Sequence, residues 1–324
     1  MAPRSHRSMT ARTVVVSHAA PGVCLRVTDS DAGFVPRHGI GEMVSLRHQR
    51  GLAARGAADR RSVVIAVVSG KGGVGKTTLS VNLACALGLR GVAVLLVDAD
   101  LGMASADLMF GVTPRRHLGH VLSGMCAPED AVIDAAPGVR LIGGGSGWEG
   151  EAEISAFEFS LLVERLRDGS HGAHVVLIDA GAGVSRQVWG PACASDRVIV
   201  VTTPEPTAMA DAYVMIKTLH RHGVRGRVCL FENLVDTRAD GAQTYERIAR
   251  VASGFLGVEI EDAGCCLSDS AVVEAVRRRR PVVLCDGAGP ASASFGRAAD
   301  ELLRTMGASE RAEGFVRKVA GFFL

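Results

Sequence analysis

The sequence predicts an α/β fold in which a doubly wound, mainly parallel sheet is covered by helices on both faces. Short runs of apolar residues recur along the chain, and segments of helical length separate them. Continuous apolar runs are typical of strands buried on both faces, and alternation of strands with helices is typical of parallel sheets. A glycine-rich loop also follows the first run, at the position where such folds bind ligands.

The apolar runs define five expected strands, and four helices are expected in the same part of the chain. The strands are Val63–Val68, Ala93–Val97, Val175–Ile178, Val198–Thr202 and Val228–Phe231. The helices are Lys76–Gly88, Ile154–Arg167, Ala208–His220 and Gln243–Phe255. We expect three parts: a mostly flexible extension over residues 1–61, a main domain over 62–308, and an amphipathic helix over 309–324.

Composition narrows the class of protein. The 324 residues carry a formal net charge of only +2. The electrostatic field of the whole chain therefore does not attract it to nucleic acid or to anionic lipid, and binding to a specific nucleic acid is not expected. No apolar stretch reaches the ~18–20 residues that span a bilayer, and the start lacks the apolar core of a secretory signal. We therefore expect a cytoplasmic protein. The eight cysteines form no C-x-x-C pair.

The stretch Gly70-Lys-Gly-Gly-Val-Gly-Lys-Thr77 fits the phosphate-loop pattern G-x-x-x-x-G-K-[ST]. It follows an expected strand and opens an expected helix. Glycines allow backbone N–H groups to surround phosphate oxygens, and the helix start adds its positive dipole end. Lys76 is expected to neutralise the β and γ phosphates of ATP, and Thr77 to offer its hydroxyl to Mg²⁺. The expected ATP-binding residues are Gly70, Lys71, Gly72, Gly73, Val74, Gly75, Lys76, Thr77 and Thr78.

Carboxylates follow two of the expected strands. Asp98 and Asp100 follow Ala93–Val97, and Asp179 follows Val175–Ile178. Side chains at the carboxyl ends of parallel strands face the ligand crevice. Mg²⁺ binds few carboxylates and keeps several waters, so Thr77, Asp98 and Asp179 are the expected metal residues. The alternative is that one of the three carboxylates caps a following helix.

A second lysine, Lys71, stands directly after the first glycine and gives Lys-Gly-Gly-Val-Gly-Lys-Thr. This stretch resembles the deviant Walker A family, which includes MinD, ParA and the nitrogenase iron protein. In that family the extra lysine contacts ATP on the partner subunit, so the resemblance implies that Lys71 couples ATP binding to homodimer formation. It also implies that Asp100 positions the attacking water, that Asp179 lies near Mg²⁺, and that Asp98 supports the water shell of the metal.

The resemblance gives Asn233 a role as well. Asn233 stands where relatives use asparagine to contact adenine, whose edge needs both a donor and an acceptor. A simple turn asparagine is the alternative.

Several stretches resemble one branch of this family, called FlhG, YlxH or FleN, whose members regulate flagellar number and placement. They are residues 98–107, 143–147, 179–185, 201–208 and 275–281. The branch commonly has Asn where Ser105 stands and Thr where Ala180 stands. Residues 41–47 keep only the Leu-Arg end of a motif that in the family stimulates the signal-recognition-type GTPase FlhF. FlhF and flagellar basal-body or regulator proteins are the partners that the resemblance implies.

The end of the chain is apolar on one helical face. The residues that share this face are Phe315, Val316, Val319, Phe322 and Phe323. Arg317 and Lys318 lie off it, and a short basic amphipathic helix is typical of membrane-surface anchors. MinD-type proteins carry such a tail, which binds membrane in the ATP-bound dimer, where two tails act by avidity. A helix docked on the core or on a partner is the alternative.

Together these features predict a slow, dimer-dependent ATP hydrolase that uses ATP and Mg²⁺. We expect it to attach reversibly to the inner face of the cytoplasmic membrane and to control flagellar number or position. One alternative is a DNA- or cargo-partitioning ATPase of the ParA type, for which the run Arg277–Arg280 would offer a basic surface. Another is an iron–sulfur carrier ATPase, which would need bridging cysteines.

Overall fold

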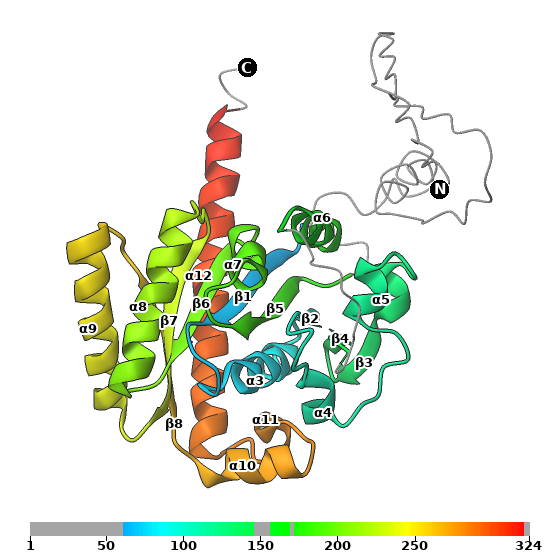
Figure 1. Cartoon of the computed structure of the whole chain (residues 1–324), viewed down its shortest axis with the longest axis horizontal. Helices are drawn as coiled ribbons and strands as arrows, with labels where there is room; N and C mark the ends of the chain where they lie inside the picture. Colours follow the sequence, from blue (N-terminus) through cyan, green and yellow to red (C-terminus); the bar gives the residue numbers. More distant parts are fainter. Residues whose placement is uncertain (1–60, 146–155, 169–171, 321–324) are drawn as a thin grey trace, which may run out of the picture. The chain divides into compact units, whose positions relative to one another are not determined.

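The computed structural model describes residues 61–145, 156–168 and 172–320, without the side chains of 156–157 and 307–320. Within these residues eight strands form one sheet in the order β3-β4-β2-β5-β1-β6-β7-β8 (Figure 1). The strands are β1 (Val63–Ser69), β2 (Val94–Asp98), β3 (Ile133–Ala136), β4 (Val139–Ile142), β5 (Val175–Ala182), β6 (Arg197–Thr202), β7 (Arg227–Val235) and β8 (Glu261–Leu267).

All neighbouring strands in the described sheet are parallel except β3, which pairs antiparallel with β4. The five strands predicted from apolar runs correspond to β1, β2, β5, β6 and β7, and the predicted fold class is confirmed. The hairpin β3–β4 and the strand β8 were not predicted. β3 and β4 have four residues each, and β8 has the sequence EDAGCCL, which contains no apolar run.

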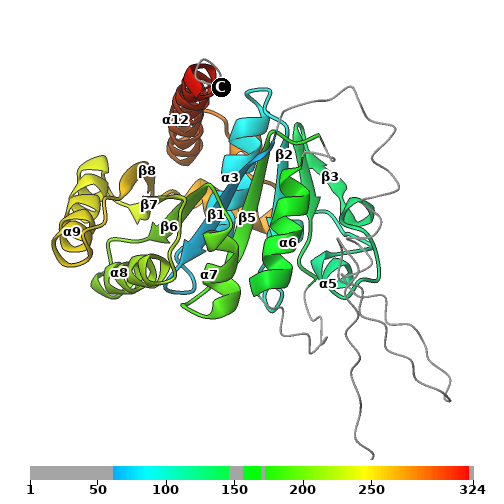
Figure 2. The ribbon, with the colours of Figure 1, turned by 90° about the horizontal axis from the view of Figure 1, so that it is seen from above.

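Helices cover both faces of the sheet. They are α3 (Lys76–Gly88), α4 (Ala106–Phe110), α5 (Leu118–Leu122), α6 (Ala156–Arg167), α7 (Arg186–Cys193), α8 (Pro206–Arg221), α9 (Arg238–Leu256), α10 (Ser270–Arg277), α11 (Val282–Cys285) and α12 (Pro290–Ala320), with a 3₁₀ turn at Pro128–Ala131. Figure 2 shows α3 and α12 on one face and α6, α7, α8 and α9 on the other. The predicted helices correspond to α3, α6, α8 and α9.

Successive residues of the central strand β1 pack on opposite faces. Ile65 and Val67 belong to the apolar cluster with α3 and α12, whereas Ala66 and Val68 belong to the cluster with α7 and α8. All four are fully buried. Because both faces are covered, the strand is apolar from Val63 to Val68, which explains the continuous run in the sequence.

The register of the parallel strands brings their carboxyl ends to one edge of the sheet. Asp98 at the end of β2 pairs with Asp179 in β5, and Asp179 pairs with Val67 in β1. The loop that leaves β1 therefore starts beside Asp179, and Asp98 lies one strand further away. This edge holds the residues that the sequence marked as functional.

The last helix, α12, runs without a break from Pro290 to Ala320 and so enters the predicted tail. Phe315, Val316 and Val319 belong to α12, but their side chains are outside the description. Phe322 and Phe323 lie outside the described residues, as do residues 1–60 with the motif at 41–47. Within the described part, no helix combines the length and apolarity needed to cross a membrane.

Candidate functional site

The loop between β1 and α3 has the conformation that the phosphate-loop pattern requires. Gly73 has φ 80° and Gly75 has φ 89°, a left-handed conformation that residues with a Cβ avoid. α3 begins at Lys76, and Gly75 has no side chain that could cap it. The first backbone N–H groups of α3 are thus open to an anion, and the dipole of the helix favours one there.

Asn233 supports this loop from β7. Its side chain is buried, and its Nδ2 donates a hydrogen bond to the backbone oxygen of Val74 at 2.8 Å. A Cβ on Gly75 would overlap the same Nδ2. Asn233 lies within β7 rather than in a turn. The bond fixes the position of the loop, while the contact of Asn233 with adenine stays a prediction.

Asp98 holds the segment that follows β2. Its Oδ2 accepts hydrogen bonds from the backbone N–H groups of Ser105 at 2.9 Å and Ala106 at 3.0 Å, at the start of α4. Its Oδ1 accepts one from the N–H of Asp100 at 3.2 Å. Both oxygens therefore bind the backbone, which is the capping arrangement considered as an alternative. A role of Asp98 in the water shell of a metal stays a prediction.

Asp179 is fully buried beside the start of α3. Its Oδ1 accepts a hydrogen bond from Ser80 Oγ at 3.0 Å, and the hydroxyl of Thr77 and the charge of Lys76 also act on the carboxylate. Its Oδ2 is buried without a hydrogen-bond partner among the described residues. Burial, followed by the charge of Asp98, raises the pKa of Asp179.

These groups fit a magnesium ion. A buried carboxylate oxygen without a donor has a strong need for a cation or a proton, and it lies beside the threonine that the motif assigns to Mg²⁺. Thr77 and Asp179 are therefore the residues that would hold Mg²⁺ next to the phosphates. A bound cation would also return the pKa of Asp179 toward its usual range, because it favours the charged form.

Asp100 borders a cavity of about 240 Å³ at the same edge of the sheet. The cavity is also lined by Gly181, Arg186 and Val188, and a Cβ on Gly181 would stand 3.7 Å from the Asp100 carboxylate. Asp100 Oδ1 accepts a hydrogen bond from the N–H of Met103 at 3.2 Å. A carboxylate that borders a cavity of this size can orient a water molecule, and the role that the resemblance implies for Asp100 stays a prediction.

Lys71 extends to the start of α8. Its Nζ donates hydrogen bonds to Glu205 Oε2 and to Thr207 Oγ1, each at 3.2 Å, and its side chain is 41% exposed. Sequence reasoning singled out the stretch that contains Glu205 and Thr207 but not its contact with Lys71. It also missed Ser80, although Ser80 lies one helical turn after Lys76 and so faces the same way.

The structure thus brings together the residues predicted for the nucleotide and metal site, whereas the predicted membrane residues of the tail are not part of it. The loop Gly70–Thr78 lies beside Asp98, Asp179 and Asn233, and Asp100 follows Asp98 at the same edge. Ser105 and Ala180, the two positions at which the chain differs from the branch pattern, have different structural environments. The N–H of Ser105 binds Asp98 while its hydroxyl does not cap α4, and Ala180 is buried in the sheet.

Comparisons with known proteins agree with this site. Residues 65–282 match the CobQ/CobB/MinD/ParA nucleotide binding domain. The chain is 35% identical to the antiactivator FleN of Pseudomonas aeruginosa, over 72% of this chain and 83% of FleN. It is 34% identical to the flagellum site-determining protein YlxH of Helicobacter pylori, over 67% of this chain and 73% of YlxH.

A solved structure shares the fold. The septum site-determining protein MinD of Pyrococcus horikoshii, determined in complex with Mg-ADP, superimposes with a TM-score of 0.65 at 25% identity, covering 76% of this chain and 98% of MinD. The family match spans the phosphate loop, the carboxylates and Asn233. The chain therefore belongs to the CobQ/CobB/MinD/ParA nucleotide-binding family, in the branch that contains FleN and YlxH.

Proposed function

We propose that this ATPase is a switch in which bound ATP joins two copies of the chain and hydrolysis separates them. The observation that carries the proposal is the position of Lys71. It belongs to the phosphate loop, yet its ammonium group is bonded to Glu205 and Thr207 at the start of α8. A second lysine that is exposed and directed out of its own loop is available to a nucleotide bound by another subunit.

The release of Lys71 requires little free energy. Its ion pair with Glu205 joins side chains that are 41% and 67% exposed, and exposed pairs contribute about 0–1 kcal/mol. A triphosphate on the partner subunit offers several negative charges in a site without competing water. Exchange of Glu205 for that triphosphate therefore favours the dimer.

Within each subunit, different residues bind the phosphates, hold the metal ion and orient the attacking water. The backbone of Gly70–Gly75 and the start of α3 bind the phosphates, and Lys76 neutralises their charge. Thr77 and Asp179 would hold Mg²⁺, which neutralises charge that develops on the phosphate oxygens. Asp100 orients the attacking water toward the γ-phosphate. Turnover is slow because the water is positioned only when the dimer closes the site.

We further propose that the C-terminal segment attaches the dimer to the inner face of the cytoplasmic membrane. The support is the apolar face of residues 315–323 together with the unbroken course of α12 to Ala320. One short amphipathic helix binds weakly, and two on one dimer bind by avidity. Membrane attachment would then follow ATP binding.

The output of the switch would be control of flagellar number or placement. Support comes from FleN, named an antiactivator, and YlxH, named a flagellum site-determining protein, which share a third of their aligned residues with this chain. The flagellar GTPase FlhF and basal-body or regulator proteins are the proposed partners. A deletion strain with altered flagellar number, restored by the wild-type gene, would test this role.

A second candidate is a ParA-type ATPase that binds DNA as a dimer. Arg277 and Arg278 pair with Glu274, whereas Arg279 and Arg280 have no ion pair among the described residues and are exposed. Exposed arginines of this kind suit phosphate contacts. An ATP-dependent gel shift that weakens steeply with salt would favour this candidate over the membrane-attached switch.

The variant Asp100→Ala tests the proposed switch. We expect it to bind ATP with Mg²⁺, to hydrolyse it far more slowly, and to accumulate as a dimer in light scattering after size exclusion. Asp134→Ala is the matched control, because Asp134 is exposed on the edge strand β3. If Asp100→Ala stays a monomer at saturating ATP, the assigned role of Asp100 is wrong.

A further inference from the structure

Ser80 of α3 is fully buried at the nucleotide edge of the sheet. Its Oγ donates a hydrogen bond to Asp179 Oδ1 at 3.0 Å, across 99 positions of the chain. Ser80 comes three residues after Thr77, so the two hydroxyls lie on one face of the helix, and both act on the same carboxylate. Ser80 has no part in the chemistry assigned to Thr77 and Asp179.

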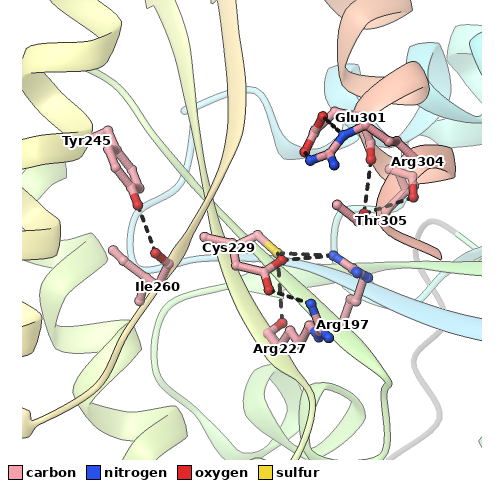
Figure 3. Close-up of polar contacts among 10 residues, drawn as sticks. Arg197, Arg227, Cys229, Tyr245, Ile260, Glu301, Arg304 and Thr305 are labelled. Atoms are coloured by element: carbon pink, nitrogen blue, oxygen red, sulfur yellow. Dashed lines mark hydrogen bonds and ion pairs between the residues drawn. The ribbon is translucent and has the colours of Figure 1, made fainter. Parts of the chain in front are cut away.

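Hydroxyl groups inside a helix often bond to the helix itself. Thr305 of α12 is an example, because its Oγ1 donates to the backbone oxygen of Glu301 at 3.0 Å (Figure 3). Ser294 of the same helix is another, with a bond of 2.9 Å to the backbone oxygen of Pro290. Ser80 differs, because its hydroxyl is bonded to a carboxylate of the sheet.

Packing of α3 does not call for a hydroxyl at this position. Buried alanines, Ala84 and Ala86, occupy other positions of the same helix. Alanine has a higher helix propensity than serine, and burial of a hydroxyl costs free energy that its hydrogen bond must offset. What the serine supplies, and an alanine would not, is therefore the bond to Asp179.

The carboxylate of Asp179 has one held oxygen and one open oxygen. Oδ1 accepts the hydrogen bond from Ser80, whereas Oδ2 is buried without a hydrogen-bond partner among the described residues. Rotation about the Cβ–Cγ bond of an aspartate is only weakly restricted by the torsion itself. The bond to Oδ1 therefore determines which oxygen stays open and holds that oxygen in place.

We propose that Ser80 is a positioning residue for the magnesium ion. Its hydroxyl holds Asp179 so that Oδ2 remains free for the ion or its water shell, and Ser80 itself does not bind the ion. Hydrogen bonds to the ligands of a metal ion orient those ligands, and their loss typically lowers metal affinity about 10–100-fold. This role rests on the proposed function, in which Thr77 and Asp179 hold Mg²⁺, but not on dimer formation.

Calorimetric titration of the full chain with ADP tests this role, once with Mg²⁺ and once with EDTA. ADP is not hydrolysed and lacks the γ-phosphate, so neither turnover nor the proposed dimer enters the measurement. In the wild-type chain Mg²⁺ should lower the Kd of ADP. Ser80→Ala should lose most of this gain, because the metal site weakens about tenfold or more. Its Kd in EDTA should stay within about twofold of the wild-type value, since the phosphate loop is unchanged.

Three further variants separate positioning from packing. Ser294→Ala is the matched control, because it removes a hydroxyl that is equally buried and hydrogen-bonded, but within α12, and it should keep the wild-type gain. Ser80→Thr keeps the hydroxyl and should restore the gain. Ser80→Cys fills the space with a thiol that donates only weakly, so it should lose most of the gain, as Ser80→Ala does. Circular dichroism melts would establish that each variant is folded before titration.

The outcomes distinguish the role of Ser80 from the magnesium site itself. An unchanged gain in folded Ser80→Ala or Ser80→Cys would overturn the role of Ser80 and leave the magnesium site in place. An equal loss of the gain in Ser294→Ala would also overturn it, because the effect would then come from any lost buried hydroxyl. If Mg²⁺ does not lower the Kd of ADP for the wild-type chain, the assignment of Thr77 and Asp179 is wrong, and the role of Ser80 with it.

Discussion

Two glycines of the phosphate loop provide a sharp test of how the loop is supported. Gly73 and Gly75 both have left-handed backbones, at φ 80° and φ 89°. Their surroundings differ, because a Cβ on Gly73 meets nothing within 4 Å, whereas a Cβ on Gly75 overlaps Nδ2 of Asn233. Replacement of each glycine by alanine therefore separates backbone strain from collision.

The expected magnitudes follow from these contacts. An alanine in a left-handed conformation costs about 1–2 kcal/mol at either position. Gly75→Ala also displaces the Asn233 amide from the backbone oxygen of Val74, and loss of a buried hydrogen bond adds roughly 1–3 kcal/mol. Gly73→Ala should thus lower the free energy of unfolding by about 1–2 kcal/mol, and Gly75→Ala by roughly 2–5 kcal/mol.

Denaturant unfolding without nucleotide measures both values, so that no phosphate contact enters the comparison. A double-mutant cycle with Asn233→Ala isolates the collision, because removal of the amide should bring the cost of Gly75→Ala down to that of Gly73→Ala. The reasoning is refuted if the two alanines are equally destabilising in the wild-type background. It is also refuted if Asn233→Ala leaves their difference unchanged.

Two further predictions concern a buried acid and the tail. Burial, followed by the charge of Asp262, raises the pKa of Glu232 from 4.5 to about 9. Glu232 loses its proton near pH 4.5 in the unfolded chain but only near pH 9 in the folded chain. Between these two pH values the unfolded state is favoured as the pH rises. The free energy of unfolding of the wild-type chain should therefore fall, relative to that of Glu232→Gln, by up to about 1.4 kcal/mol per pH unit. A pH-independent difference between the two proteins in urea unfolding would contradict this assignment. In the tail, replacement of Phe322 and Phe323 by serine should abolish ATP-dependent sedimentation with anionic liposomes and leave ATP hydrolysis in solution intact, and unchanged sedimentation would remove the proposed anchor.

Much of the fold and of the candidate site follows from local sequence. β1 is apolar from Val63 to Val68 because helices cover both of its faces, so a continuous run is enough to find it. The phosphate loop is local too, since its glycines and Lys76 follow one another in the chain. Asp98 and Asp179 were found because they directly follow such runs.

What the sequence does not predict depends on distant contacts. β8 pairs only with β7 at the edge of the described sheet, and its polar and small residues give no periodic signal. The contact of Lys71 with Glu205 joins residues 134 positions apart, and the bond from Asn233 to Val74 joins residues 159 apart. The hydrogen bonds that both carboxylate oxygens of Asp98 accept from the backbone also become visible only when β2 and α4 are placed in space.

The central claim is that Lys71 joins ATP occupancy to dimer formation, and the mass of the Lys71→Met variant tests it most directly. Light scattering after size exclusion, with a non-hydrolysable ATP analogue and Mg²⁺, should show a dimer for the wild-type chain and for Lys217→Met, an exposed control on α8. Lys71→Met should keep its fold, because an exposed ion pair contributes only about 0–1 kcal/mol, and should bind the analogue as a monomer. A Lys71→Met chain that dimerises like the wild type would contradict the account.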